Sequence, residues 1–191
     1  MEDQRENRIQ MFEDTLQGCE RNRRLLEAIC WTREHTEVYA AGHLRPERTV
    51  CRVIPAGGNV MAMARQIHME NPDRRLGIWN CCSTFYPGGG VFQGREGVEE
   101  SLCRCTTLYP CLNTTVLWEQ YYEPNRRTRS GGDRCIVTPD IICVGNDEAG
   151  KGWNPEEEWF VVDVISGTAE LQHILQIADS SHIANLVVGS C

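Results

Sequence analysis

The sequence of 191 residues lacks the features that mark membrane and secreted proteins. No apolar run approaches the roughly 20 residues that a membrane helix needs, so we expect no membrane span. The first ten residues, MEDQRENRIQ, are charged and contain no apolar core of a signal peptide, which predicts an intracellular protein, cytoplasmic or nuclear. There are no repeats and no linker rich in proline, glycine or serine, and the length suits one domain with its own core.

Lysine is almost absent. Lys151 is the only one, so arginine supplies nearly all of the positive charge. The net charge of −8 argues against direct binding to nucleic acid, since such binding draws its affinity from neutralising phosphates. Four arginines nevertheless gather in the stretch RRTRSGGDR, namely Arg126, Arg127, Arg129 and Arg134. A solvated loop is the interpretation that we favour, and a phosphate-contacting patch is the alternative.

A metal-binding pattern is also missing, although the sequence has 11 cysteines. There is no CxxC motif, and no histidine lies at zinc-finger spacing from the closest pairs, Cys81-Cys82 and Cys103-Arg104-Cys105. The odd count and the expected reducing compartment argue against a disulfide framework. We therefore expect most cysteines to be small buried hydrophobic residues, and we expect neither a metal nor a cofactor.

The apolar pattern predicts helices that alternate with buried strands. Helices are expected within residues 9–19, 25–30, 60–70, 98–109 and 169–179, with Asn59 and Thr168 as N-caps of the third and the last. Strands are expected within residues 75–82, 134–145, 158–166 and 183–189, with a bend or an edge at Pro139. Since the strands have apolar residues on both sides, the pattern indicates an α/β domain of three layers. We interpret residues 1–191 as a single domain whose helical N-terminal segment covers residues 1–36.

One stretch carries candidate chemistry: YPGGGVFQGREGVEESLCR, from Tyr86 to Arg104, joins a triple glycine to two adjacent glutamates. It follows a predicted strand and opens a predicted helix, and ligands of open α/β sheets bind at such strand ends. Without a Cβ, a glycine lets a phosphate or a ribose approach backbone N–H groups. A tight turn would explain the glycines equally well, and acidic residues at the start of a helix can simply oppose its dipole.

The paired glutamates have a second interpretation. Two carboxylates that face a diphosphate disfavour each other's ionisation, and a glutamic acid that stays protonated can donate a proton to a leaving group at an anomeric carbon. The residues alone do not choose between a helix-capping role and an acid.

The stretch NCCSTFYPGGGVFQGREGVEESLCRCTTLYPCL, residues 80–112, resembles the microbial-type poly(ADP-ribose) glycohydrolases, which are divergent macrodomains. Their signature is a triple glycine followed by six to eight residues and Gln-Glu-Glu, and here Gly88-Gly89-Gly90 is followed by seven residues and Val98-Glu99-Glu100. Three further stretches are weakly similar to the family: YY, VTPDIICVGNDE and the closing LVVGSC. All of these motifs occur in the same order as in the family, along about residues 30–191.

That resemblance implies a macrodomain, a mixed sheet between two helical layers. It implies that Asn80 contacts the ribose distal to the adenosine, that Glu100 protonates the leaving ribose oxygen, and that Glu99 holds ribose hydroxyls. The residues implied to cradle the ribose and the diphosphate are Gly88, Gly89, Gly90, Val91 and Phe92. The implied ligand is ADP-ribose or an ADP-ribosylated protein.

Two departures from the family pattern lower the activity that we expect. Val98 stands where the family has glutamine, and the sequence given ends at Cys191, where the family continues with a Gly-Cys-Gly loop over the diphosphate. We therefore predict a shortened ADP-ribose-binding macrodomain that hydrolyses ADP-ribosyl bonds weakly, or whose site a protein partner or a second copy closes. The alternative is a catalytically inactive scaffold used as a structural or assembly protein, for example in a virus particle.

Overall fold

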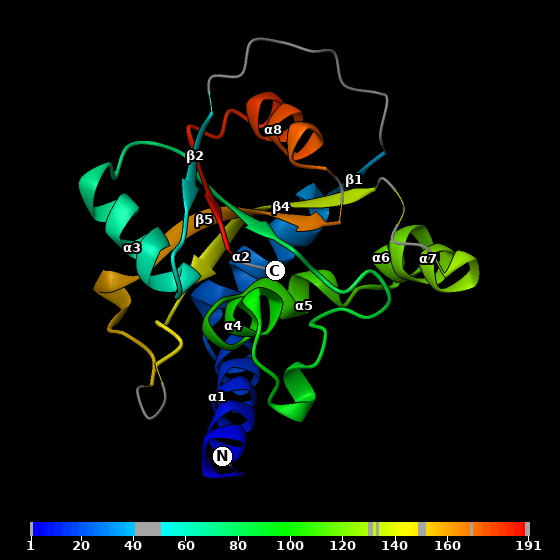
Figure 1. The fold of residues 1–191 in the computed structure, drawn as a ribbon. Helices are drawn as coiled ribbons and strands as arrows, with labels where there is room; N and C mark the ends of the chain where they lie inside the picture. The colour runs from blue at the N-terminus through cyan, green and yellow to red at the C-terminus, as the bar shows by residue number, and fades with distance from the viewer. Residues whose placement is uncertain are drawn as a thin grey trace.

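A mixed β-sheet forms the centre of the molecule. The structure, a computed structural model, describes residues 2–40, 51–129, 132, 134–148, 152–168 and 170–189. The strands in this part of the chain are β1 (Glu37–Tyr39), β2 (Arg52–Pro55), β3 (Leu76–Asn80), β4 (Cys135–Cys143), β5 (Phe160–Gly167) and β6 (Asn185–Val188). They form one six-stranded sheet in the order β1-β4-β5-β3-β6-β2 (Figure 1). The run from β5 to β2 is parallel, whereas β4 pairs antiparallel with β1 and with β5, so the prediction of a mixed sheet is confirmed.

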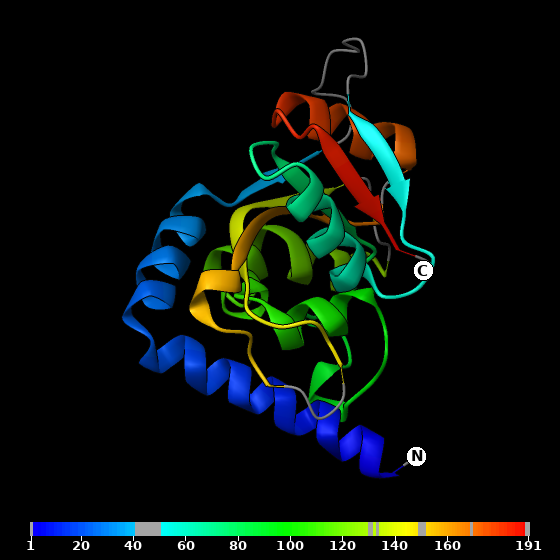
Figure 2. The same cartoon turned by 90° about the vertical axis from the view of Figure 1, so that its left-hand side faces the viewer.

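Helices cover both faces of the sheet, as the three-layer prediction requires. The longer helices are α1 (Glu2–Arg21), α2 (Arg23–His35), α3 (Val60–Glu70), α4 (Val98–Cys105) and α8 (Leu171–Ser180). The shorter ones are α5 (Leu108–Leu112), α6 (Thr115–Leu117), α7 (Glu123–Thr128), the 3-10 turns η1 (Val91–Gln93) and η3 (Glu156–Glu158), and the π-helical turn η2 (Trp118–Tyr122). Figure 2 shows α8 above the sheet and the long helix α1 below it.

Each central strand sends side chains into both layers of the core. In β5, Val162 and Val164 pack in the cluster that contains residues of α1 to α5, whereas Ile165 packs in the cluster that contains Ile174 of α8. The nearly continuous apolar character of this strand is therefore a consequence of burial on both faces.

Local capping signals place α3 where the sequence predicts it. The side-chain oxygen of Asn59 accepts hydrogen bonds from the N–H groups of Met61 and Ala62, at 2.9 and 3.1 Å. The helix ends at Glu70, before Asn71-Pro72, so both predicted ends are confirmed.

The predicted helix over residues 98–109 is wrong at its end. α4 stops at Cys105, because Thr106 forms a bridge with Cys143 of β4. A new helix, α5, then begins at Leu108 and contains Pro110 in its first turn, where the missing N–H has no intrahelical partner to lose.

The last helix also begins later than predicted. α8 starts at Leu171, and Glu170 occupies the N-cap position without a side-chain cap bond. Thr168 lies too far ahead of the first helical turn to accept from its N–H groups, so its prediction as a cap is wrong. The bend at Pro139 is confirmed, since the register of β4 against β5 shifts between Thr138 and Ile141.

The cysteines of the described chain are mostly buried, as expected, whereas Cys81 is disulfide-bonded, against the expectation of reduced thiols. Those in the core are Cys19, Cys51, Cys82, Cys103, Cys105, Cys111, Cys135 and Cys143. Among the described residues, no group of three histidine, cysteine or acidic side chains is placed to hold a metal ion. No helix in the same residues has the length and apolar character needed to span a bilayer.

Candidate active site

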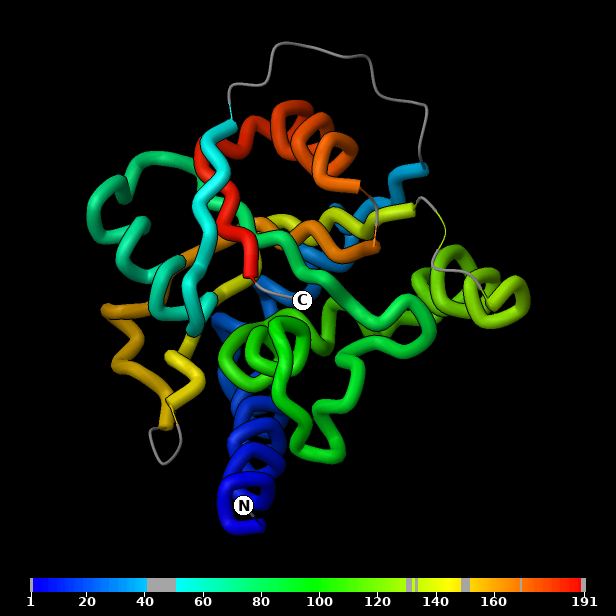
Figure 3. The backbone as a smooth tube through the Cα atoms, viewed as in Figure 1, coloured from blue at the N-terminus to red at the C-terminus, as the bar shows by residue number. Residues whose placement is uncertain are grey.

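Parallel strands place their following loops at one edge of the sheet. Because β2, β3, β5 and β6 are parallel, their carboxyl ends meet there, and this edge is where open α/β sheets bind ligands. The loop after β3 contains the triple glycine, and the loop after β2 leads into α3. Figure 3 follows the chain from β3 outward toward α6 and α7 and back to the start of α4. We call residues 81–97 the glycine loop.

Glycine is required in this loop by conformation and by space. Gly88 and Gly89 have φ angles of 76° and 53°, in the left-handed region that side chains rarely adopt. A Cβ on Gly89 would lie 2.8 Å from Oε1 of Glu100 and 2.9 Å from Oε2 of Glu99. The backbone of Gly89 therefore touches both carboxylates, which no other residue type would permit without displacing them.

Glu99 is a buried carboxyl group that holds the glycine loop. Its side chain accepts two backbone hydrogen bonds, from the N–H of Ser83 at 2.7 Å and from the N–H of Gly88 at 2.9 Å. The residue is only 3% exposed. Burial raises the pKa of Glu99 to about 8, and the charge of Glu100 adds to this, although the two N–H groups act in the opposite direction. Glu99 is therefore largely protonated near neutral pH.

Glu100 lies nearer to solvent and keeps one oxygen available. Its Oε1 accepts a hydrogen bond from the N–H of Gly90 at 2.8 Å. Its Oε2 lies so close to Gly97 that a Cβ there would overlap it, and within the described chain no hydrogen bond occupies this oxygen. The N-cap of α4 is Gly97, which makes no side-chain cap bond. The two glutamates thus bond the glycine loop and not the amino end of their own helix, so a capping hydrogen bond does not explain them.

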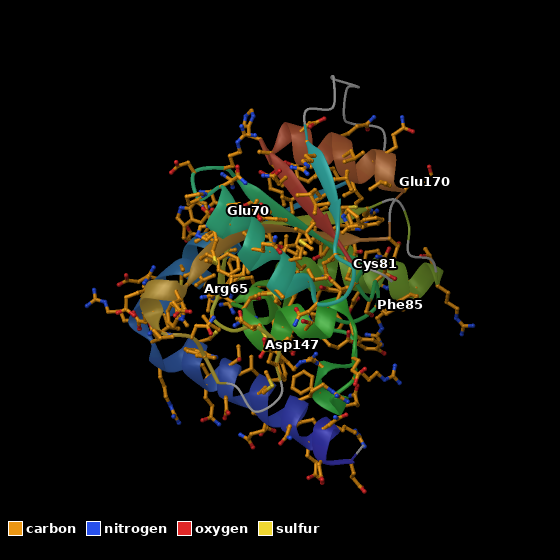
Figure 4. All side chains as sticks on the ribbon, turned by 60° about the vertical axis from the view of Figure 1, so that its left-hand side comes forward. Arg65, Glu70, Cys81, Phe85, Asp147 and Glu170 are labelled. Carbon is orange, nitrogen blue, oxygen red and sulfur yellow. The ribbon has the colours of Figure 1, made fainter. Side chains whose placement is uncertain are left out.

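A cavity of about 740 Å³ opens beside this pair. Of the residues that the sequence singled out, Gly89, Gly90, Phe92, Glu99 and Glu100 line it. Its further lining includes Tyr86, Arg95, Tyr109, Asn113 and Trp118, which sequence reasoning did not name. Figure 4 labels Cys81 and Phe85 near the start of the loop that forms one wall. Tyr86 and Tyr109 fall inside the stretch that carries the resemblance, whereas no signal in the sequence indicated Trp118.

The structure places the other singled-out residues, Asn80, Gly88 and Val91, outside the cavity lining. Val91 is fully buried in the main core, and a Cβ on Gly88 would lie 2.8 Å from Cδ2 of Tyr109. Asn80 is fully buried at the carboxyl end of β3 and donates from Nδ2 to Oγ of Ser166 at 3.0 Å. Its Oδ1 is buried without a hydrogen-bond partner in the described chain. Direct contact between these three residues and a ligand stays a prediction.

A second cavity, of about 370 Å³, adjoins the first across the amino end of α4. The two cavities share Gly97 and Val98 in their linings. The second is also lined by Arg8, by the start of α3, and by the ion pair between Arg104 and Asp147. In that pair the guanidinium donates to both carboxylate oxygens, at 2.6 and 2.8 Å, and Arg104 is buried. Figure 4 labels Asp147 beside α4.

A mixed sheet between helical layers, with its cavity at the carboxyl ends of parallel strands, defines a macrodomain-like α/β domain. A family model described as the microbial-type PARG catalytic domain matches residues 6–145, well over half of the chain. The chain therefore belongs to the microbial-type poly(ADP-ribose) glycohydrolase family, and the resemblance drawn from the glycines and glutamates is confirmed. No curated protein sequence matches the chain at a significant level.

Solved structures of bacterial enzymes have the same fold. A poly(ADP-ribose) glycohydrolase from Thermomonospora curvata is 19% identical with a TM-score of 0.79, over 95% of this chain and 78% of that one. The same enzyme bound to the inhibitor ADP-HPD has 19% identity and a TM-score of 0.74, over 94% of this chain and 77% of that one. A glycohydrolase from Deinococcus radiodurans in complex with ADP-ribose has 21% identity and a TM-score of 0.67, over 84% of this chain and 74% of that one.

Proposed function

We propose that this chain binds ADP-ribose and hydrolyses ADP-ribosyl glycosidic bonds. The observation that carries the proposal is the pair Glu99 and Glu100, held against the backbone of Gly89 at the wall of the larger cavity. Membership in the glycohydrolase family supports this assignment. Both carboxyl groups are in place, with their hydrogen bonds made, and this favours an enzyme over an inactive scaffold.

Glu100 is the group that we assign to proton transfer. In its protonated form Glu100 donates a proton from Oε2 to the oxygen that leaves the anomeric carbon, while the N–H of Gly90 holds Oε1. The C–O glycosidic bond then breaks, and a water molecule adds to the anomeric carbon after giving a proton to the Glu100 carboxylate. The products are free ADP-ribose and an acceptor with its hydroxyl restored, and the glutamate returns to its protonated state.

Glu99 acts on the same ribose without transferring the proton. A carboxyl group with a pKa of about 8 is largely neutral at pH 7, so it can hydrogen-bond ribose hydroxyls without adding much negative charge beside a diphosphate. Its two bonds to Ser83 and Gly88 keep the glycine loop in the shape that the ligand meets.

The shared wall of the two cavities suggests how an elongated ligand lies. We place the distal ribose in the larger cavity and the rest of ADP-ribose toward the smaller one, across Gly97 and Val98. There the guanidinium of Arg8, which is paired with Glu96 at 2.7 Å, and the dipole at the amino end of α3 favour phosphate oxygens.

A thermal-shift titration of the full chain with ADP-ribose tests the binding step. Free ligand at 100 times its Kd adds about 2.7 kcal/mol to the free energy of unfolding. For a chain of this size that corresponds to a rise in Tm of roughly 5–11 °C, at about 2–4 °C per kcal/mol. AMP and ribose 5-phosphate serve as matched partial ligands, and each should give a smaller rise. An unchanged Tm at millimolar ADP-ribose would favour the scaffold.

Three further expectations stay predictions. They are the intracellular location, the closure of the site by a protein partner or a second copy, and the single domain over residues 1–191. The last is supported by the packing of α1 on the site, where the rings of Phe12 and Phe92 meet edge to face with centroids 4.9 Å apart.

A further inference from the structure

Three consecutive carbonyl groups of the glycine loop accept hydrogen bonds from arginine side chains. Two of these arginines belong to α1 and the third belongs to α4, so two helices hold the same part of the loop. A carbonyl that accepts from a guanidinium cannot turn away without losing a charge-assisted hydrogen bond, so the three bonds fix the path of the loop. The pairs of donor and acceptor are Arg5 with Gln93 at 2.8 Å, Arg8 with Gly94 at 2.7 Å, and Arg104 with Arg95 at 2.9 Å.

Of these three arginines, Arg104 shares its helix with Glu100. The two residues are four positions apart in α4 and therefore lie on the same face of it, on adjacent turns. Glu100 accepts from the N–H of Gly90, and Arg104 donates from Nη1 to the loop five residues further on. Within the loop, the N–H of Arg95 donates to the carbonyl of Gly90 at 3.2 Å. Glu100 and Arg104 thus hold the turn of residues 90–95 at both of its ends, and we call this arrangement the α4 clamp.

Asp147, in the segment after β4, fixes the guanidinium of Arg104. Nε and Nη2 donate to the two carboxylate oxygens, which leaves Nη1 for the glycine loop. The side chain of Arg104 is only 2% exposed and that of Asp147 is 15% exposed, so water competes little with these bonds. The backbone of Arg104 is held too, because the hydroxyl of Thr15 donates to its carbonyl at 2.6 Å. Every nitrogen of the guanidinium has a partner, so Arg104 has one defined position beside the loop.

Stability alone does not account for this ion pair. A buried ion pair gains little over apolar residues of similar volume, because both charges must leave water. A second bidentate pair joins Arg75 to Asp163, and Arg75 also pairs with Asp140. Arg75 directly precedes β3, at the end of that strand away from the cavity, and makes no bond to the glycine loop within the described chain. Arg104 differs, because its remaining donor goes to the loop that holds Glu100.

The clamp controls the direction of the Glu100 carboxyl group. If the carbonyl of Arg95 moves, the N–H of Gly90 moves with it, because the two residues are hydrogen-bonded to each other. Oε1 of Glu100 then turns with that N–H, and Oε2 turns away from the leaving oxygen. Proton transfer needs the two oxygens within about 2.6–3.2 Å, and a displacement of about 1 Å can lower a rate on the order of 10²-fold.

We infer that Arg104, fixed by Asp147, is a positioning residue that holds Glu100 in the orientation for proton transfer. This inference rests on the proposed function, and it assigns the buried ion pair a role in the rate. Arg104 acts through Glu100 and transfers no proton itself. Although Arg104 lines the smaller cavity, its nitrogens are all engaged within the protein, so it offers the ligand no further donor group. A change at Arg104 should therefore alter kcat and leave KM and the Kd for ADP-ribose near native values.

Steady-state turnover of poly(ADP-ribose) by Arg104→Lys tests the inference. Lysine keeps a positive charge for Asp147, but its single ammonium group lacks the fork that also reaches the carbonyl of Arg95. We expect kcat to fall roughly tenfold to 10²-fold, with KM and the Kd for ADP-ribose close to native values. The matched control is Arg75→Lys, the same substitution in the second bidentate pair, which should keep the native kcat. Circular dichroism at the assay temperature shows whether each variant is folded.

A double variant separates positioning from a general role in the structure. The Glu100→Gln chain has no acidic proton to direct, so adding Arg104→Lys should lower its residual kcat little further. Independent effects would instead multiply. Asp147→Asn is a second variant, because it removes the charge that fixes the guanidinium and keeps the shape of the side chain. It should lower kcat in the same way, and only while Glu100 is present.

Each other outcome overturns a defined part of the account. If the native chain turns over the polymer and both variants match its kcat, the inference fails while the proposed function stands. If the native chain neither binds ADP-ribose nor turns over poly(ADP-ribose) or a mono-ADP-ribosylated peptide, the proposed function fails and the inference fails with it.

The remaining outcomes assign the ion pair a different role. If Arg104→Lys raises KM and the Kd for ADP-ribose at an unchanged kcat, Arg104 acts on binding and the inference is wrong. If kcat falls equally in Arg75→Lys, or if the two losses multiply in the double variant, the role of Arg104 is only structural. Loss of the native circular dichroism in both Arg104→Lys and Asp147→Asn would likewise show a role in the fold and contradict a specific role in the rate.

Discussion

Replacing Gly89 with alanine tests the link between the glycine loop and the two glutamates. At a φ of 53°, a residue with a side chain costs about 1–2 kcal/mol. The new Cβ would also lie 2.8 Å from Oε1 of Glu100 and 2.9 Å from Oε2 of Glu99, so at least one carboxyl group must move. Each of these oxygens accepts a backbone N–H, and a lost hydrogen bond costs about 0.5–1.5 kcal/mol at a neutral carboxyl group and about 1.5–3 kcal/mol at a charged one. We therefore expect Gly89→Ala to lower the free energy of unfolding by about 2–5 kcal/mol.

The assay is urea denaturation together with a thermal-shift titration with ADP-ribose. At about 2–4 °C per kcal/mol, the Tm of the variant should fall by roughly 5–20 °C, and the shift with ADP-ribose should be lost. The matched control is Gly57→Ala, because a Cβ at Gly57 would meet nothing within 4 Å and its φ is not in the left-handed region. Equal stability of the two variants, with ADP-ribose binding intact in Gly89→Ala, would refute the assigned contact between the loop and the glutamates.

Three other changes have definite expected outcomes. The pKa of Glu99 is about 8 in the native state and about 4.5 in the unfolded state, so the native state binds this proton more tightly. The free energy of unfolding therefore falls as pH rises from about 4.5 to 8. At 1.36 kcal/mol per unit the fall amounts to a few kcal/mol, and urea denaturation at pH 5 and pH 8 should show a smaller difference for Glu99→Gln than for the native chain. Asp147→Ala leaves the buried guanidinium of Arg104 unpaired and should cost about 3–5 kcal/mol in the same assay, whereas Glu123→Ala removes an exposed i,i+4 pair and should cost less than about 1 kcal/mol. A strong chelator should leave the Tm unchanged, and unfolding upon its addition would show that the chain holds a structural metal.

Elements with strong local signals were predicted well from the sequence. α3 has its start at the cap of Asn59 and its end before Asn71-Pro72, and both signals act within a few residues. The strands β3, β4, β5 and β6 have apolar residues on both sides because both faces of the sheet are covered.

Elements that depend on distant partners were not predicted. β1 and β2 have only three and four residues, and none of these is fully buried, so neither strand stands out as a buried apolar run. The break between α4 and α5 arises because Thr106 bridges to Cys143, which is far away in the sequence. No local pattern reports such a contact.

The candidate site also combines residues that are close in the sequence with residues that only the fold brings together. The glycines and the paired glutamates were found because they lie in one short stretch of sequence. Tyr86 contacts Trp118 and Arg126 at the cavity wall, and Arg104 pairs with Asp147, so these contacts arise only when the chain folds. Sequence order gave no reason to bring these side chains together.

The most direct test of the central claim compares Glu100→Gln with the native chain in a turnover assay on poly(ADP-ribose), together with the Kd for ADP-ribose. The amide keeps the oxygen that accepts from Gly90 but cannot donate an acidic proton. We expect kcat to fall on the order of 10²-fold or more, while the Kd and the Tm stay close to native values. The control is Glu157→Gln, the same substitution at an exposed position, which should leave all three quantities unchanged. Turnover by Glu100→Gln at the native rate would contradict the claim that Glu100 supplies the proton.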